Sequence, residues 1–535
     1  MLQSRPSDNY PVPVIDPRTR QPIMASLVTI LYDQWGRAMA LSGAYTGASY
    51  SRRSMAAWNP AARDADSSIS YDITILQNRS QDLLRNSPLA VGAVNTTITN
   101  VVGSGLKFQS RIDRKALKMS DDEANEWEEN TEREWRMFAD SQDIDISRTL
   151  TFDGFCDLGF RKVLEDGDVF CIMPMVERSN SPYSLRLQLI EAARVCNADN
   201  KSNSETLFMG VEKDQYGAPI QYHVLNQHPN ATFSLKSRKW DKIEAFNEKT
   251  GLRNVIHLFK PLRPGQSRGV PWLSPVIETI KQLDRYTEAE IMAAVISGFF
   301  TVFLEREQGM SLGFGNMIGD QNVDTYVTGN PTDESIKLGS GSIVELPQGT
   351  KANFADPSRP NSTFDPFVKA VLEQVGTALG IPFEILIGHF SASYSASRAA
   401  LIQAWMFFLC RRLWLSRIFC QPIYENFLSE GIAIGRVPAP GFFRDPMIQK
   451  AYCGNPDVQW IGNSMPQIDP EKEITAAKER VLLGVSTLDK ETTTLGCGDF
   501  QDNQPQIRKE RAFVQEVGLW APVTQKEEIV MEEVI

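Results

Sequence analysis

The chain has 535 residues, of which 42% are hydrophobic, 9% aromatic and 23% charged. This composition excludes a disordered chain, and at about 150 residues per domain it predicts three to four domains. The 55 Lys and Arg against 66 Asp and Glu leave a formal net charge of −11, which argues against a broad basic surface that grips duplex DNA.

Cysteine usage and hydropathy indicate a protein of the cytosol, or one assembled there. The first apolar stretch, 24–32, follows a polar leader broken by prolines, which is not the pattern of a secretory signal. The most apolar segment, 401–420, contains Gln403 and three arginines, so no uncharged run approaches the roughly 20 residues that span a bilayer. The seven cysteines form no C-x-x-C pair, which argues against a disulfide scaffold or a zinc ribbon and favours buried thiols. They are Cys156, Cys171, Cys196, Cys410, Cys420, Cys453 and Cys497.

The first 140 residues predict a leader followed by helices. Residues 1–22 are polar and rich in proline, which is typical of a flexible segment. Helical spacing over 75–102 predicts two helices separated at Asn86-Ser87-Pro88. Residues 121–139 predict an amphipathic helix with one aromatic stripe.

Between residues 165 and 260 the hydrophobic period shortens to two. A turn at 214–219 separates runs rich in β-branched and aromatic residues, and this pattern predicts a mostly antiparallel β domain. The clearest runs are 169–173, 185–190, 222–225 and 255–259.

Two long helices then enclose a small strand module. The first, 275–297, would be about 35 Å long at ~1.5 Å per residue. Strand-like runs at 299–304 and 342–346 border a glycine-rich stretch. The second helix, 365–379, stops at Gly380-Ile381-Pro382, a typical helix end. We expect the two helices to run side by side with the module at their far end.

The last third of the chain contains the longest apolar helix. A loop of small residues, 389–397, precedes that helix at 398–430, which Pro422 is expected to kink. Another helix begins at Asp469-Pro470, and the chain ends in the acidic segment 527–535. The helices 275–297 and 365–379, with the module at their tip, form an elongated insertion that buries little against its own chain. Its apolar faces therefore need neighbours, and this suggests a ring-like oligomer.

Motifs of enzymes and cofactor sites are missing from the sequence. There is no G-x-x-x-x-G-K-[ST], no G-x-S-x-G and no H-E-x-x-H, and Gly313–Gly319 is one residue too long for a dinucleotide loop. The four histidines do not cluster as metal ligands would. We expect His223 and His257 to pack within β runs, whereas His389 lies in a loop and is the candidate for exposure near function.

Three acids leave open an alternative function. Asp143, Asp145 and Asp168 could form a metal-dependent nuclease or hydrolase site. Acids in turns are common as caps, so we favour a structural role for them.

The apolar helix carries two further groups with alternative roles. Its aromatic residues could stack on bases, but helical spacing favours core or subunit contact. They are Trp405, Phe407, Phe408, Trp414 and Phe419. Its arginines could reach phosphates, but pairing with neighbouring acids is favoured. They are Arg411, Arg412 and Arg417.

Short motifs spread over residues 55–515 occur together in a characteristic order. They are Trp58-Asn59-Pro60, Arg79-x-x-Asp82-Leu83-x-Arg85-Asn86, Val102-Gly103-x-Gly105, Gly167-Asp168, Ile190-Glu191-x-x-Arg194, Ile256-His257-Leu258-Phe259, Arg263-Pro264-Gly265-Gln266-x-Arg268-Gly269, Leu346-Pro347-x-Gly349, Gly380-Ile381-Pro382, Tyr394-Ser395-x-Ser397-Arg398 and Asp469-Pro470-x-Lys472-Glu473. In this order and spacing the chain resembles the portal proteins of tailed bacteriophages, in particular the lambda-like class.

The resemblance implies an α+β portal fold, with a mixed α/β wing, a helical stem, a small β-containing clip and a helical crown. It implies a dodecameric ring at one capsid vertex, whose axial channel passes double-stranded DNA, without regard to sequence, in packaging and ejection. The implied partners are the terminase large subunit, a head-completion or adaptor protein, and the major capsid or scaffold protein. It implies no enzymatic activity, cofactor, metal or membrane, and a location in the virion, after assembly in the host cytoplasm.

The resemblance also divides the chain into regions. The expected regions are a leader and peripheral segment (1–54), the wing (55–265), the first stem helix (266–304), the clip (305–362), the second stem helix (363–382), a tunnel loop (383–397), a long wing helix with return strands (398–467), and the crown helices with the acidic tail (468–535). A scaffold or adaptor without a channel remains an alternative.

Two sets of residues follow as candidates for function. The expected DNA-facing tunnel loop contains no Lys or Arg, so it would touch phosphates without the affinity that counterion release supplies. Its candidate residues are His389, Phe390, Ser391, Ser393, Tyr394 and Ser395. The candidates for stem and subunit contacts are Arg268, Gly269, Tyr286, Arg398, Trp405 and Trp414.

Overall fold

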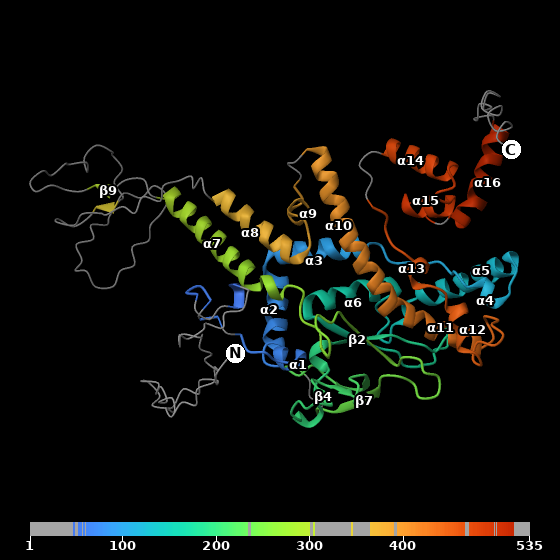
Figure 1. Ribbon diagram of the computed structural model, residues 1–535, viewed down its shortest axis with the longest axis horizontal. Coiled ribbons are helices and arrows are strands. Elements are labelled where there is room, and N and C mark those ends of the chain that lie inside the picture. The colour runs from blue at the N-terminus through green and yellow to red at the C-terminus, as the bar shows by residue number, and fades with distance from the viewer. Residues whose placement is uncertain are drawn as a thin grey trace, which may run out of the picture. The chain divides into compact units, whose positions relative to one another are not determined.

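The computed structural model of the chain (Figure 1) divides into two units, Met1–Asp64 and Ala65–Ile535, which are described separately. The residues that it describes are 46–48, 52–55, 57–58, 60–233, 237–299, 303–304, 344–345, 364–389, 393–465, 470–496, 498 and 500–517. In the first unit they include a 3-10 turn, Thr46–Ala48. The second unit, Ala65–Ile535, contains all the other described helices and strands.

The first two long helices of this unit are separated at the position that the sequence predicts. After the short α1 (Ala65–Ile69), α2 spans Ile73–Asn86 and α3 spans Pro88–Val101. Pro88 sits in the first turn of α3, where its missing N–H costs nothing. The predicted helix at 121–139 is α5 (Asp121–Ala139), which begins with a capping box between Ser120 and Glu123.

The predicted antiparallel β domain is confirmed as two sheets. In the first, β2 (Asp168–Ile172) lies between β3 (Gln188–Glu191) and β8 (Val255–Phe259). The second has the order β4-β5-β6-β7, and every strand pair in both sheets is antiparallel. Its strands are β4 (Leu207–Phe208), β5 (Val211–Lys213), β6 (Pro219–Leu225) and β7 (Trp240–Glu244).

The two predicted stem helices lie side by side (Figure 1). They are α7 (Ile277–Phe299) and α8 (Phe364–Leu379), and the ring of Tyr286 on α7 contacts Phe364 and Phe367 at centroid distances of 5.6 and 5.3 Å. The short strands β9 (Phe303–Leu304) and β10 (Val344–Glu345) pair in parallel. The rest of the expected clip, 305–362, lies outside the described residues, as does Gly313–Gly319.

The long apolar helix begins earlier than predicted. After α9 (Phe383–Ile387), α10 spans Tyr394–Leu415, so it begins four residues before Arg398 and includes part of the expected tunnel loop. A π-helical turn, Ser416–Cys420, joins it to α11 (Gln421–Ala433). The turn ends two residues before Pro422, which has no N–H to donate to the previous turn, so the predicted irregularity takes the form of a π turn.

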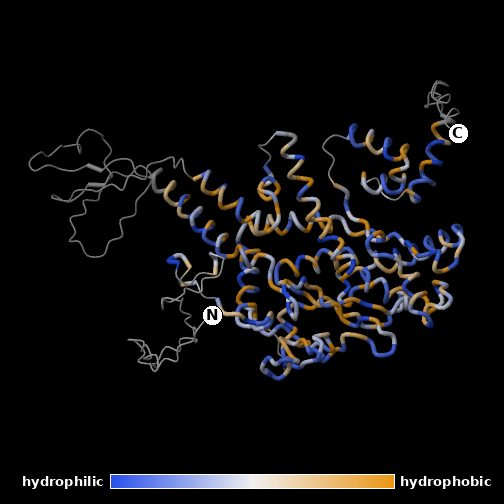
Figure 2. The backbone as a smooth tube through the Cα atoms, in the orientation of Figure 1, coloured by the Kyte–Doolittle hydropathy of each residue, from blue (hydrophilic) through white to orange (hydrophobic). Residues whose placement is uncertain are grey.

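One large hydrophobic core joins the helices and the first sheet. Trp135 of α5 lies at its centre, with its ring at 5.0 Å from Phe152, 5.1 Å from Phe427 and 5.6 Å from Trp460, all edge to face. Figure 2 shows hydrophobic stretches of these helices and of the sheet lying together in the middle of this unit. A smaller cluster fills the space between the two sheets.

Short elements and the C-terminal helices complete the unit. The remaining elements between α3 and the long helix are β1 (Lys107–Phe108), α4 (Arg114–Leu117), α6 (Phe152–Asp166) and four 3-10 turns. The turns are Gln142–Ile144, Ala192–Arg194, Ala198–Asn200 and Ser274–Val276. After α11 come α12 (Pro446–Cys453), α13 (Pro456–Gln459), β11 (Trp460–Ile461), α14 (Pro470–Leu482), α15 (Leu488–Thr494) and α16 (Phe500–Val517). Of the described helices, none is long and apolar enough to span a membrane.

Candidate functional site

A buried charge cluster joins two of the sequence motifs. Asp168 begins β2, and Arg268 comes from the loop before α7. The Arg268 Nε and Nη2 donate to the two carboxylate oxygens of Asp168 at 2.5 and 3.2 Å, and the other guanidinium hydrogens reach backbone carbonyls. Arg268 is 1% exposed and Asp168 is 0% exposed, so this ion pair lies entirely inside the chain.

Two glycines allow these loops to meet. Gly167 has φ 91°, and a Cβ there would lie 2.5 Å from the carbonyl carbon of Val270. A Cβ on Gly269 would overlap the carbonyl oxygen of Gly167. The Gly269 N–H donates to Asp168 Oδ2 at 3.0 Å. The pairs Gly167-Asp168 and Arg268-Gly269 therefore hold two loops of the same chain together. The prediction that Arg268 and Gly269 contact a neighbouring subunit is wrong, because both are enclosed in this contact.

The acids that could have formed a hydrolytic site have structural partners. Burial would raise the pKa of Asp168, but Arg268 and His257 hold it well below its usual range. Burial also opposes ionisation of Asp145, yet hydrogen bonds from Ser147 and Thr149 lower its pKa to about 2. Asp143 pairs with Arg148 at 3.1 Å. The described residues contain no group of three His, Cys, Asp or Glu placed to hold a metal ion.

The histidines of the β runs pack as predicted. The His257 ring is stacked between Phe170 and Phe259 at centroid distances of 4.1 and 4.2 Å, and its Nε2 lies 3.2 Å from Asp168. His223 is 1% exposed and lies 3.1 Å from Glu212. Both rings are held by neighbours within the chain.

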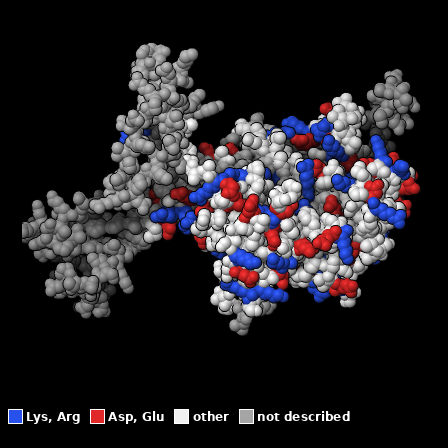
Figure 3. All heavy atoms as spheres, turned by 60° about the horizontal axis from the view of Figure 1, so that its bottom comes forward, with Lys and Arg blue, Asp and Glu red and all other residues white. Residues whose placement is uncertain are grey.

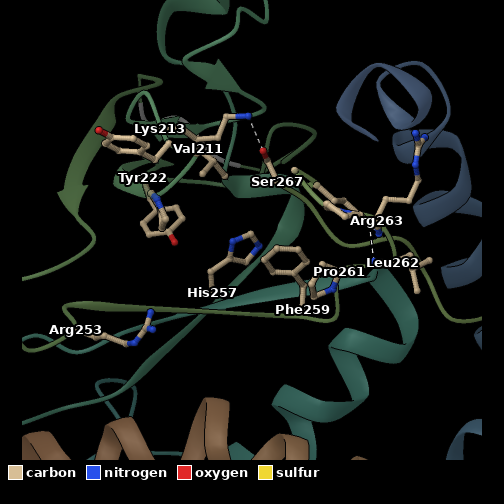
Figure 4. A pocket seen from close by; sticks show the side chains of 16 residues that line it. Val211, Lys213, Tyr222, Arg253, His257, Phe259, Pro261, Leu262, Arg263 and Ser267 are labelled. Atoms are coloured by element: carbon tan, nitrogen blue, oxygen red, sulfur yellow. Dashed lines mark hydrogen bonds between the residues drawn. The ribbon is translucent and has the colours of Figure 1, made fainter. Parts of the chain in front are cut away.

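Beside the charge cluster is a cleft of about 630 Å³ between β5, β6, β8 and the loop 261–267. Figure 4 shows the rings of Tyr222, His257 and Phe259 at this cleft, with Arg253 and Arg263 at its opposite ends. Its lining includes no acidic residue. On the face in Figure 3, by contrast, basic and acidic side chains alternate over the described residues, which fits the predicted lack of a broad basic surface.

Of the three arginines of the long helix, only Arg417 pairs with an acid as predicted. For Arg411 and Arg412 the predicted acidic partner is wrong, because a ring and backbone carbonyls take its place. Arg417 donates to both carboxylate oxygens of Asp457 at 2.6 and 2.5 Å. Arg412 is 5% exposed and donates to the carbonyls of Asn100, Val101 and Asn463, so it caps the C-terminal end of α3. Burial lowers its pKa to about 10. The Arg411 guanidinium lies 4.8 Å from the centre of the Phe407 ring.

The aromatic residues of this helix are core residues. Phe408 and Phe419 are buried, and Trp405, Phe407 and Trp414 are half-buried against the same core. The favoured interpretation of these rings as core, rather than as a platform for bases, is confirmed.

A different face of the long helix is apolar and exposed in the single chain. Ile402, Met406 and Leu409 follow one another at i, i+4 and i+7 and are 44%, 66% and 39% exposed. We call these three residues the α10 stripe. On α7, Ile291, Met292 and Val295 are similarly exposed. Sequence reasoning missed the α10 stripe, because α10 is apolar on several faces and its pattern does not separate the core face from the exposed one.

The tunnel-loop candidates are only partly described. His389 and Ser393 are exposed, and Ser393 is the N-cap residue of α10. Tyr394 and Ser395 form the first turn of that helix, while Phe390 and Ser391 lie outside the described residues. Arg398, one turn further along, pairs with Glu473 of α14 at 2.5 Å.

Comparison with known proteins identifies the family. A family profile described as "Phage portal protein, lambda family" matches residues 51–412, more than half of the chain. The chain belongs to the lambda family of phage portal proteins. It is therefore a structural protein of the virion rather than an enzyme.

Relatives of this portal-family chain cover most of its length. It is 24% identical over 499 residues to "Portal protein B" of Escherichia phage lambda, covering 90% of this chain and 91% of the relative. It is 25% identical over 484 residues to "Portal protein" of Escherichia phage N15, covering 87% and 89%.

Two solved structures that the chain matches come from gene transfer agent particles. They are "Virion of native gene transfer agent (GTA) particle" (TM-score 0.36, 11% identity) and "Neck of empty GTA particle computed with C6 symmetry" (TM-score 0.37, 12% identity), and each match covers 80% of this chain and 94% of the other. Both TM-scores lie below 0.5, so the family assignment rests on the sequence.

Proposed function

We propose that twelve copies of this chain form a ring at one capsid vertex, and that double-stranded DNA passes through its axial channel in packaging and ejection. The observation that carries this proposal is the α10 stripe. Single exposed apolar residues are ordinary on a protein surface, whereas a continuous apolar face marks an interaction site. A second copy of the chain is the partner that we assign to it.

The geometry of such a contact favours a closed ring. The α10 stripe and the exposed apolar residues of α7 belong to different helices, so one copy can present one face and receive the other. Contacts between unlike faces are heterologous, and they close into a ring when the rotation between copies divides a full turn. Tyr286 and Trp405 lie on these same two helices and are half-buried.

The tunnel loop, 383–397, is the part of the ring that we assign to DNA contact. The proposed contacts come from His389, Phe390, Ser391, Ser393, Tyr394 and Ser395. Twelve copies with net charge −11 each carry a formal −132, and the loop contains no cation. Because each neutralised phosphate adds affinity through released counterions, a loop without cations lets DNA slide with little friction.

The family supports the remaining partners of this proposal. The terminase large subunit would dock at the clip (305–362), and the head-completion or adaptor protein would join the same ring after packaging. The wing (55–265 and 398–467) would face the major capsid or scaffold protein, and the crown would comprise 468–535. The ring would assemble in the host cytoplasm and remain in the virion.

A pair of variants tests the assignment of the α10 stripe. Met406→Glu places a carboxylate in the stripe, and burying that charge against a neighbour is costly, so we expect the ring to dissociate or fail to form. Gln403→Glu is the matched control, since Gln403 is an exposed polar residue of the same helix. Mass measurement and negative-stain images should show rings for the wild type and the control and subunits for Met406→Glu. Intact rings of Met406→Glu would contradict the assignment.

A further inference from the structure

One buried arginine has guanidinium N–H groups that form no hydrogen bond with the described residues. Arg186, in the segment between β2 and β3, is 0% exposed. Its Nη1 donates to the carbonyl of Leu185 at 2.8 Å, but its Nε and Nη2 have no partner among the described residues. A buried cation without hydrogen-bond partners is strongly unfavourable. An acceptor that the described residues do not supply therefore belongs at this edge of the guanidinium.

Other arginines of this chain show what that edge binds. In four of them the Nε and Nη2 donate together to one carboxylate, in the bidentate geometry typical of guanidinium and oxyanions. The four pairs are Arg268 with Asp168, Arg417 with Asp457, Arg436 with Glu134 and Arg480 with Glu491, at 2.5 to 3.2 Å. Arg186 presents the same edge without an anion.

The charged groups near Arg186 already have other partners. Those that act on it most strongly are the cations Arg148 and Arg178 and the anions Asp143 and Glu430. Glu430 accepts from the backbone N–H of Ser184 and Leu185, and Asp143 pairs with the two other arginines. Neither anion accepts a hydrogen bond from the Nε or Nη2 of Arg186.

The carboxylate of Asp145 does not supply the missing acceptor either. It is turned toward its own loop, where it accepts from the side chains of Ser147 and Thr149 and from the backbone N–H of Leu150. Its oxygens are thus occupied by neutral donors, and the Nε and Nη2 of Arg186 remain without an acceptor.

We propose that the Nε and Nη2 edge of Arg186 binds a small monovalent anion of the size of chloride, enclosed within the wing. The full burial of Arg186 excludes a carboxylate from a neighbouring subunit and any polymeric anion. The anion supplies the acceptor that Nε and Nη2 lack and compensates the buried charge of Arg186.

Thermal unfolding of the full-length protein in different anions tests this site. At constant ionic strength, replacing gluconate, which is too large to be enclosed, by chloride or bromide should raise the unfolding midpoint saturably by about 3–5 °C, because a ligand that binds the folded state stabilises it. A midpoint that is the same in gluconate and in chloride would overturn the proposal, since a buried water in place of the anion gives that result.

Variants then assign the effect to Arg186. Arg186→Met removes the charge and keeps an apolar chain of similar length, so its midpoint should not respond to chloride. The control is Arg85→Met, at an exposed arginine of α2, which should respond as the wild type does. The broadening of the chloride-35 resonance by the protein should also be lost in Arg186→Met. Persistence of the chloride response in Arg186→Met would contradict the site.

Discussion

The carboxylate of Asp168 and the guanidinium of Arg268 are 100 residues apart in the chain and meet at 2.5 Å in its interior. The sequence contains both motifs, but nothing in their spacing indicates that they pair, because contacts between distant loops depend on the whole fold. The same holds for Arg186, whose missing acceptor cannot be recognised before its burial is known. Asp168, which could have belonged to a hydrolytic site, instead joins two loops through its ion pair with Arg268.

The first prediction concerns this buried pair. Asp168→Asn removes the negative charge and leaves Arg268 buried without a counterion, so we expect the free energy of unfolding to fall by about 3–5 kcal/mol. Urea unfolding measures the change. Asp241→Asn, at an exposed position of β7, is the control and should change stability by less than about 0.5 kcal/mol. Equal free energies of unfolding for the two variants would mean that the ion pair of Asp168 and Arg268 does not stabilise the contact between the loops.

The second prediction concerns Asp166, the last residue of α6. Burial raises its pKa from 3.8 to about 6, although Lys162 lies 3.3 Å away. The folded chain thus binds this proton more tightly than the unfolded chain, and the resulting stabilisation is complete below about pH 4 and lost as the pH rises through 6. Asp166→Asn should remove this component of the pH dependence of the unfolding midpoint and raise the midpoint at pH 7. An unchanged profile between pH 4 and 7 would show that Asp166 is not the titrating group.

At the scale of elements, the sequence predicts those whose ends carry local signals. The helix α5 has a capping box, and α3 begins with proline. The helix α6 went unpredicted, although it packs against α2 and the first sheet. The strand β7 was also missed, because three of its five residues are exposed and charged, and its partner β6, rather than its own pattern, fixes it in the sheet.

The third prediction distinguishes a residue of the long helix that packs in the core from one that is proposed to contact a neighbouring subunit. Trp414 is half-buried against the core, so Trp414→Ala should cost about 2–3 kcal/mol, below the range for a fully buried ring. Met406→Ala, in the α10 stripe, should leave the unfolding of the separate subunit nearly unchanged and weaken the ring. Urea unfolding and mass measurement distinguish the two effects. The interpretation fails if Trp414→Ala unfolds like the wild type.

At the scale of the whole molecule, the fourth prediction concerns DNA movement. Introducing Lys at Ser391 and Ser393 should slow packaging and make its rate dependent on salt, because twelve copies would add phosphate contacts around the channel. The double variant with Gln at both positions has similar bulk and no charge, and it should package at the wild-type rate. Equal rates for the Lys and Gln variants would count against contact between this loop and DNA.

The proposed ring requires that further copies of the chain cover the exposed faces of α7 and α10. End-on negative-stain images of the purified protein, together with its mass in solution, test this claim directly. We predict a closed ring with a central hole and a mass near twelve times 60.0 kDa. A folded, stable monomer at the same concentration would contradict it.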